Sequence, residues 1–215
     1  MKKIYFAYGA NTNKGAMRRR CPNAKPVGAG HIKGYKLKFN NVADIVPFPN
    51  RDSLMNQDVP CVIWEITPDC EKALDRFEGF PSLYRKVDVE GYMGENYFYE
   101  NGSIPTKING FVYKMNYSGF HTPSPYYVRG IRDGLKGFFT DHDMVDRHID
   151  QAIIKAFVRV RNSLSNQEWS EVSSGDSCLL GKSPALRSWV FSGVGSNNCS
   201  DWHRIGHDAG LKSLV

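Results

Sequence analysis

Residues 61–79, CVIWEITPDCEKALDRFEG, place an apolar run directly before an amphipathic segment, and this order decides the expected fold class. The run over residues 61–66 has the length and composition of a buried strand. Thr67 is a favoured N-cap residue, and Pro68 suits the first position of a helix. Gly79 suits the position directly after a helix. The stretch therefore predicts a strand over residues 61–66 and a helix over residues 68–78.

The expected helix ends on an acidic residue, Glu78, where the helix dipole disfavours a negative charge by about 0.3–1 kcal/mol. At helical spacing, Glu78 lies at the edge of an apolar stripe formed by Cys70, Ala73, Leu74 and Phe77. A carboxyl group placed there would have its pKa raised toward the range of a general base. A partly exposed glutamate paired with Arg85 is the alternative, and the local pattern leaves both open.

A second candidate is the turn Tyr8-Gly9-Ala10-Asn11, between a strand expected over residues 4–7 and a helix expected over residues 13–20. Successive backbone N–H groups at such a turn can form an anion-binding nest. Gly and Asn are also common in turns for conformational reasons alone. The turn is therefore either a binding loop or a structural turn.

The remaining pattern predicts a mixed α+β domain. Apolar periodicity predicts a long helix over residues 143–161, with core positions Val145, Ile149, Ala152, Ile153, Ala156 and Val160. Further strands are expected over residues 35–39, 84–89, 95–99 and 108–115, with 84–89 and 95–99 forming a hairpin.

Composition excludes several classes of protein. The chain is 41% hydrophobic and 13% aromatic, which excludes a mainly disordered chain, and it has no run of about 20 apolar residues to span a membrane. The N-terminal apolar stretch is too short for a signal peptide, and the five cysteines form no framework of pairs. We therefore expect a cytoplasmic protein with reduced thiols.

The net charge is +6, and the densest basic run is Arg18-Arg19-Arg20. We interpret this run as a solvated basic helix end and do not expect a nucleic-acid partner. Nucleic-acid binding would instead predict a steep dependence on salt concentration.

The composition changes after residue 162. Residues 163–215 carry a net charge of −1 and are rich in Ser, Gly and Asn, yet they contain Trp169, Trp189 and Trp202. Large aromatic side chains favour a segment that docks over a free tail. We expect a folded domain over residues 1–162 and a loop-rich extension over residues 163–215.

Three other motifs compete for a functional interpretation. Gly181-Lys182-Ser183 lacks the earlier glycine of a P-loop, because position 176 is Asp176, and it is rejected. One metal candidate is the cluster Asp141, His142, Asp143, Asp146 and His148, although Asp is also a favoured capping residue at a helix start. The other, Cys199, His203 and His207, lacks a fourth ligand. We expect no metal site and no cofactor.

Four motifs follow one another along residues 4–139: Tyr8-Gly9-Ala10-Asn11; Leu74-Asp75-Arg76-Phe77-Glu78-Gly79; Tyr84-Arg85; and Pro123-Ser124-Pro125-Tyr126-Tyr127 with Ile131 and Gly134. They resemble the Tyr-Gly-Ser-Asn substrate loop, the catalytic Leu-Asp-x-x-Glu-Gly segment, the following tyrosine and the Pro-Ser-x-x-Tyr closing motif of the gamma-glutamylcyclotransferase superfamily. Residues 43–47 and 61–66 fall where members of that superfamily have two core strands. The resemblance favours the functional interpretation of both Glu78 and the turn.

The chain departs from the superfamily pattern at two places. Ala10 replaces the usual serine, so the loop lacks a hydroxyl group. The segment after Gly134 is shortened and reaches Gly137-Phe138 early.

The resemblance implies a fold and an activity. The fold is a small mixed β-barrel flanked by helices. The activity is cleavage of a small-molecule γ-glutamyl substrate, whose α-amine attacks its own γ-carbonyl and releases 5-oxoproline and an amine or amino acid, without metal or cofactor. Glu78 would be the general base, and the substrate-binding residues would be Tyr8, Gly9, Ala10, Asn11, Tyr84 and Tyr127. A binding module that uses the same pocket without catalysis is the alternative.

Overall fold

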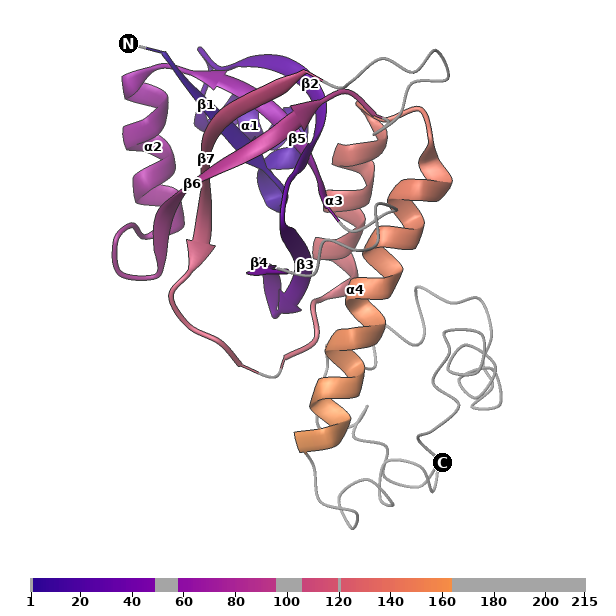
Figure 1. Cartoon of the computed structure of the whole chain (residues 1–215). Helices are drawn as coiled ribbons and strands as arrows, with labels where there is room; N and C mark the ends of the chain where they lie inside the picture. The colour runs from indigo at the N-terminus through magenta and orange to yellow at the C-terminus, as the bar shows by residue number, and fades with distance from the viewer. Residues whose placement is uncertain (1, 49–57, 96–105, 120, 164–215) are drawn as a thin grey trace. The chain divides into compact units, whose positions relative to one another are not determined.

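Five strands close into a barrel in the computed structural model, which describes residues 2–48, 58–95, 106–119 and 121–163 (Figure 1). Around the barrel the order is β1 (Lys3–Ala7), β5 (Val59–Ile66), β2 (Lys25–Ile32), β6 (Tyr84–Met93) and β7 (Lys107–Met115). β7 pairs with β1 in parallel, at Tyr5 and Phe111, and the other neighbours are antiparallel. Closure pairs the backbone N–H and C=O groups that would stay unpaired at the edges of an open sheet.

A separate two-stranded sheet stands beside the barrel. It consists of β3 (Tyr35–Asn40) and β4 (Val42–Pro47), joined through Asn41 with a φ of 65°. Asp44 ties this sheet to β7, because its Oδ1 accepts from the Met115 backbone N–H at 3.2 Å. The resemblance placed residues 43–47 among the core strands, and the structure puts them in this second sheet rather than in the barrel.

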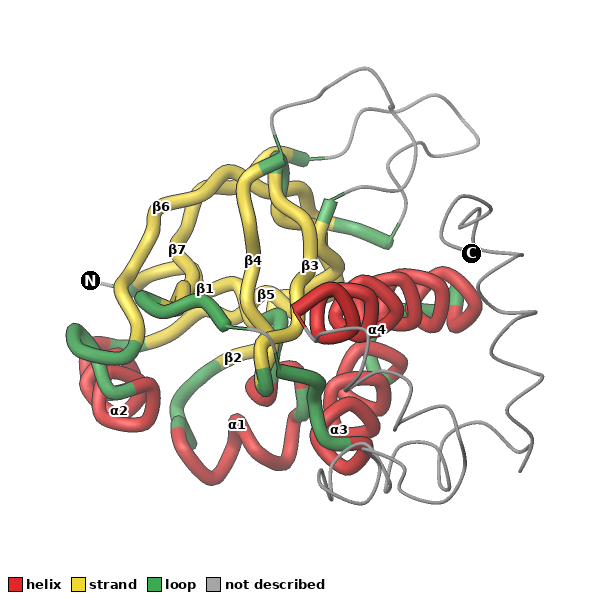
Figure 2. Tube along the Cα trace, turned by 90° about the horizontal axis from the view of Figure 1, so that it is seen from below, coloured by secondary structure: helices red, strands yellow, loops and turns green. Residues whose placement is uncertain are grey.

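Helices flank the barrel on two sides. A 3₁₀ turn, η1 (Ala10–Thr12), leads into α1 (Lys14–Arg20). α2 (Pro68–Glu78) lies on one side, and α3 (Pro125–Lys136) and α4 (His142–Ser163) lie together on the other (Figures 1 and 2). This arrangement confirms the expected mixed α+β class and the small barrel flanked by helices.

α2 has the bounds expected from its end signals. The Thr67 hydroxyl accepts from the Cys70 backbone N–H at 3.3 Å, and Gly79 has the left-handed conformation with φ 63° and ψ 35°. Leu74 is fully buried. The expected stripe is wrong at Phe77, whose side chain is 48% exposed.

The core joins the barrel to its helices. Phe6 is fully buried, and Gly91 and Gly110 leave room for its ring, since a Cβ at either position would lie within 2.8 Å of a ring atom. The expected core positions of α4 are buried, namely Val145, Ile149, Ala152, Ile153 and Ala156, whereas the side chain of Val160 lies outside the described part.

Most predicted helices and strands are present, and their ends lie no more than four residues from the expected positions. The helix expected from residue 13 begins at Lys14, because Asn13 is its N-cap and accepts from Ala16 N. β2 was not predicted, since Pro26 and Gly28 interrupt its pattern, and its register shifts between those two residues. Of the strand expected over 95–99, residues 96–99 lie outside the described part, and β6 pairs instead with β7 and β2.

Among the described residues, no helix has the length and hydropathy that a membrane crossing requires. Residues 164–215 lie outside the described part, together with the motifs at Gly181-Lys182-Ser183 and at Cys199, His203 and His207. The expected boundary at residue 162 therefore stays a prediction.

Candidate active site

The end of α2 meets the turn that follows β1. Glu78 occupies the last helical turn, and its Oε1 accepts a hydrogen bond from Asn11 Nδ2 at 3.0 Å. A second contact anchors the turn to β5, because Trp64 Nε1 donates to the Asn11 carbonyl oxygen at 3.1 Å. The structure thus brings together the two candidate motifs of the sequence.

The Glu78 carboxyl group is largely withdrawn from water. Burial raises its pKa to about 7, and the Arg20 charge and the Asn11 hydrogen bond oppose this rise only in part. Arg85, the alternative partner, lies elsewhere and donates to the Met115 carbonyl and to Asn116 Oδ1. Near neutral pH the carboxyl group can therefore both accept and return a proton.

Five tyrosine side chains lie within electrostatic range of Glu78. Burial raises the pKa of each of their hydroxyl groups, and the nearby Glu78 carboxylate raises it further, to about 12 in Tyr127. The group consists of Tyr5, Tyr8, Tyr84, Tyr113 and Tyr127. These hydroxyl groups stay protonated at neutral pH. Tyr8 and Tyr113 donate within the protein, so the hydroxyl groups of Tyr5, Tyr84 and Tyr127 are the ones that can donate hydrogen bonds to a polar ligand.

Tyr127 reaches the turn from α3. Its hydroxyl oxygen accepts from the Ala43 backbone N–H at 3.1 Å. The same oxygen would lie 3.1 Å from a Cβ at Gly9, so it covers the turn directly. The Ala10 backbone N–H, one of the expected nest donors, lies close enough to the hydroxyl group to lower its pKa.

Two local features place Tyr127 there. Ser124 is the N-cap of α3, and its Oγ accepts from the Tyr127 backbone N–H at 3.2 Å. Further along the helix, Gly134 lies against η1, where a Cβ would come within 2.7 Å of the Asn13 backbone nitrogen. The absence of a side chain at Gly134 lets α3 approach the turn closely.

Ionic contacts fix α2 to the barrel behind Glu78. Lys86 Nζ lies 2.6 Å from Glu71 Oε1 and 2.8 Å from Asp75 Oδ1. The Tyr113 hydroxyl also donates to Asp75 Oδ1, at 2.6 Å, and the Tyr8 hydroxyl donates to the Tyr113 carbonyl oxygen. The helix that carries Glu78 is thus tied to β6 and β7.

Arg20 is one of the site residues that the sequence interpretation missed, together with Tyr5, Trp64 and Tyr113. Arg20 Nη1 donates to Asn11 Oδ1 at 2.5 Å, and its guanidinium group stacks 3.5 Å from the centre of the Phe77 ring. The expectation of a solvated basic helix end is wrong for Arg20 and right for the exposed Arg18 and Arg19. No local signal separates the three arginines, since the contact depends on long-range folding.

The first metal candidate is explained by capping and ion pairs. Asp141 Oδ1 accepts from the Met144 backbone N–H at 2.8 Å, as capping at a helix start requires. Asp146 pairs with Arg132 and Lys136 at 2.6 and 2.7 Å. Among the residues that the structure describes, no group of three or more His, Cys, Asp or Glu side chains is arranged to hold a metal ion.

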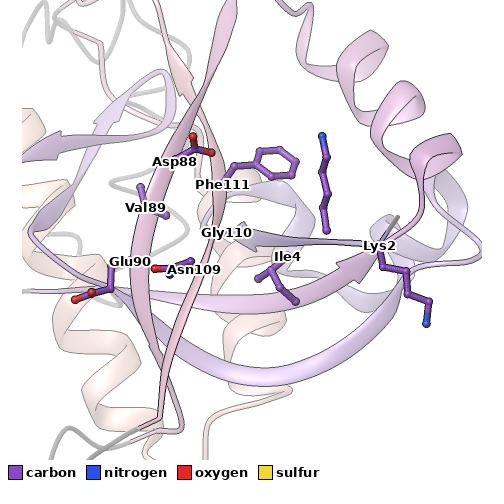
Figure 3. Close-up of a pocket in the computed structure, with 9 residues that line it drawn as sticks. Lys2, Ile4, Asp88, Val89, Glu90, Asn109, Gly110 and Phe111 are labelled. Atoms are coloured by element: carbon purple, nitrogen blue, oxygen red, sulfur yellow. The ribbon is translucent and has the colours of Figure 1, made fainter.

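A hollow of about 540 Å³ lies on a different part of the barrel, where β1 meets β6 and β7 (Figure 3). It is lined by Lys2, Lys3, Ile4, Asp88, Val89, Glu90, Asn109, Gly110 and Phe111. None of the expected substrate-binding residues is among them.

A closed five-stranded barrel with four flanking helices in the described ranges defines the gamma-glutamylcyclotransferase fold class. The sequence model of the family "Gamma-glutamyl cyclotransferase, AIG2-like" matches residues 5–126, a stretch that contains the turn, Glu78 and Tyr84. The chain belongs to this family. No curated protein matches the chain.

Solved structures with the same fold include a protein described as "Gamma-glutamyl cyclotransferase", with 22% identity, a TM-score of 0.58 and coverage of 71% of this chain and 88% of that chain. An uncharacterized protein from Homo sapiens has 23% identity, a TM-score of 0.57 and the same coverage. YkqA from Bacillus subtilis has 19% identity and a TM-score of 0.52, covering 69% of this chain and 54% of that chain. At these identities the likeness concerns the fold.

Proposed function

We propose that the protein is a cyclotransferase that cleaves a γ-glutamyl amide bond and releases 5-oxoproline together with an amine or amino acid. The observation that carries the proposal is Glu78, a carboxyl group with a pKa of about 7. It is held by the Asn11 amide at the end of α2, and neutral tyrosine hydroxyl groups lie within electrostatic range of it. Family membership supports the same chemistry.

In the proposed reaction, Glu78 acts as base and then as acid. The substrate α-amine is an ammonium group at neutral pH, and Glu78 removes one of its protons. The amine nitrogen then attacks the γ-carbonyl carbon, which forms the ring C–N bond and breaks the amide C–N bond. The proton held by Glu78 passes to the leaving nitrogen, and the second proton that the ring nitrogen loses follows the same route through Glu78. The amine therefore leaves as an ammonium group, and the Glu78 carboxylate is restored.

Closure of a five-membered ring supplies much of the proximity that the reaction needs, so binding has to hold the substrate in the folded conformation. The backbone of Tyr8, Gly9, Ala10 and Asn11 and the hydroxyl groups of Tyr84 and Tyr127 are the proposed binding groups. Donors near the γ-carbonyl would stabilise negative charge on its oxygen. Because the Tyr127 hydroxyl group covers the turn at Gly9, we assign oxyanion binding to the tyrosine hydroxyl groups first.

The proposed substrate is a small γ-glutamyl compound, and the proposed steps use groups of the chain alone, without a cofactor. We also propose a cytoplasmic location, which the free, buried thiols of Cys21, Cys61 and Cys70 support.

The test is release of 5-oxoproline from γ-glutamyl amino acids and γ-glutamyl amines, measured by mass spectrometry. Glu78→Gln keeps the shape of the side chain and removes the base, so it should abolish turnover and preserve ligand binding. Glu65→Gln is the matched control, because Glu65 forms a surface ion pair with Lys2 at 2.6 Å. Undiminished product release by Glu78→Gln would refute the assignment.

The second candidate is a binding module that captures a γ-glutamyl or amino-acid-like ligand without cleaving it. The replacement of serine by Ala10 favours it, because the loop lacks a hydroxyl group. Binding of γ-glutamyl compounds with no 5-oxoproline formed at any pH between 6 and 9 would favour the module over the enzyme.

A further inference from the structure

Both polar atoms of the Asn11 side chain, the amide oxygen and the amide nitrogen, form hydrogen bonds within the protein. Its Oδ1 accepts from Arg20 Nη1 at 2.5 Å. Its Nδ2 donates to the Tyr5 hydroxyl and to Glu78 Oε1, both at 3.0 Å. Asn11 is only 2% exposed, so water does not compete for these contacts. The amide therefore serves the protein framework rather than a ligand.

Arg20 decides which way this amide faces. An arginine side chain can only donate hydrogen bonds, and a side-chain amide has one oxygen acceptor and one nitrogen donor. With Oδ1 turned toward Arg20, Nδ2 must face Glu78. The guanidinium group is itself held over the Phe77 ring, one residue before Glu78 on α2.

We propose that Arg20 is a positioning residue that acts on Glu78 through Asn11, by fixing the amide in the orientation that donates a hydrogen bond to the carboxylate. For turnover, this inference rests on the proposed function. For the state of the Glu78 carboxyl group, it stands on the contacts alone.

The charges and polar groups near Glu78 set the expected direction of a change in its pKa. Within the described residues, the Asn11 amide and one cation, Arg20, act on the carboxyl group, and five neutral tyrosine hydroxyl groups lie within electrostatic range of it. The hydroxyl groups belong to Tyr5, Tyr8, Tyr84, Tyr113 and Tyr127. Both the charge of Arg20 and the hydrogen bond from Asn11 lower the Glu78 pKa against the effect of burial. Loss of either should raise it.

The first experiment is titration of the Glu78 side-chain carboxyl carbon by ¹³C NMR, with Glu78→Gln used to assign the signal. Arg20→Gln should raise the Glu78 pKa by about one unit or more, as loss of a nearby opposite charge does. Arg19→Gln is the matched control, because it removes the same charge from the exposed neighbouring position and should leave the titration unchanged. An unchanged Glu78 titration in Arg20→Gln would overturn the proposal.

A double-mutant cycle separates an effect through Asn11 from a charge effect across space. In an Asn11→Ala background, Arg20→Gln should shift the Glu78 pKa by less than half as much as it does in the wild-type background. Equal shifts in the two backgrounds would show that Arg20 acts by charge alone and would contradict the proposal. Asn11→Ser provides a second background if Asn11→Ala does not fold.

The activity readout follows the same logic. Arg20→Gln should lower kcat about tenfold on the acid side of the pH profile, change KM little, and recover the wild-type rate at high pH. A uniform loss at all pH values would indicate a structural role and overturn the proposal. If wild-type protein forms no 5-oxoproline, the proposed function fails, and the NMR titration still decides whether Arg20 acts through Asn11.

Discussion

Asn11 Nδ2 donates to Glu78 Oε1 over 3.0 Å, although the two residues are 67 positions apart in the sequence. The contact joins the turn after β1 to the last turn of α2. A carboxyl group in this position has lost most of its hydration and keeps one hydrogen bond from an amide and the attraction of one cation, Arg20. The stability of the protein should therefore depend on the charge of Glu78.

Glu78→Gln should stabilise the protein at alkaline pH. The Glu78 pKa is 4.5 in the reference state and about 7 in the folded protein, so the folded state binds the proton more tightly. Stability is therefore lost as the pH rises from about 4.5 to 7, by at most about 3 kcal/mol. The gain from Glu78→Gln should appear across this window in the free energy of unfolding, measured in urea. A gain that is the same at pH 4 and pH 8 would contradict this explanation.

Gly134→Ala should destabilise the protein by about 1–3 kcal/mol, because the new Cβ would meet the backbone of η1. Gly130→Ala is the control in the same helix, where a Cβ would have no neighbour within 4 Å. That control should raise stability by about 0.4–1 kcal/mol. Thermal unfolding of both variants measures the two changes in stability. Equal changes would mean that α3 does not pack closely against the turn at Gly134.

Tyr127→Phe should cost about 1–3 kcal/mol, since it removes the acceptor of the Ala43 backbone N–H group. Tyr126→Phe, at a neighbouring position that is 86% exposed, should change the free energy of unfolding by less than about 0.5 kcal/mol. Denaturant unfolding of the two variants compares them directly. A neutral Tyr127→Phe would show that the hydroxyl group does not hold the turn.

His31 should make the protein sensitive to mild acid. Burial, and the nearby His148, lower its pKa from 6.5 to about 4, and its ring packs against Phe139. The unfolded chain therefore binds the proton first, so the contribution of His31 to stability is complete above pH 6.5 and falls by up to about 3 kcal/mol as the pH drops to 4.

The measurement is the difference in the free energy of unfolding between variant and wild type across pH 4–7, because Glu78 contributes an opposite slope over the same range. For His31→Gln this difference should change by up to about 3 kcal/mol over the range, whereas the exposed control His121→Gln should keep the wild-type pH dependence. An unaltered slope in His31→Gln would assign the acid sensitivity to other groups.

Local end signals predicted α2 to the residue, because Thr67, Pro68 and Gly79 act through short-range geometry. The same signal, a capping residue followed by proline, occurs at Ser124 and Pro125 at the start of α3, where it was not used to predict a helix. β2 has no such signal. Its proline and glycines break the alternation of apolar and polar residues that predicts a strand, and the register of β2 against β5 shifts between Pro26 and Gly28.

The candidate site was predictable in part. The position of Glu78 at the edge of the buried face followed from helical periodicity and from a rule-breaking charge at a helix end. The role of Arg20 could not follow from local pattern, because its contacts with Asn11 and Phe77 exist only after α1 and α2 pack together.

The most direct test of the central claim is the rate of 5-oxoproline release as a function of pH, in wild-type protein and in Glu78→Gln. If Glu78 is the base, kcat/KM of the wild-type protein should rise through an apparent pKa near 7, and Glu78→Gln should release no product above background. A wild-type rate in Glu78→Gln would contradict the account.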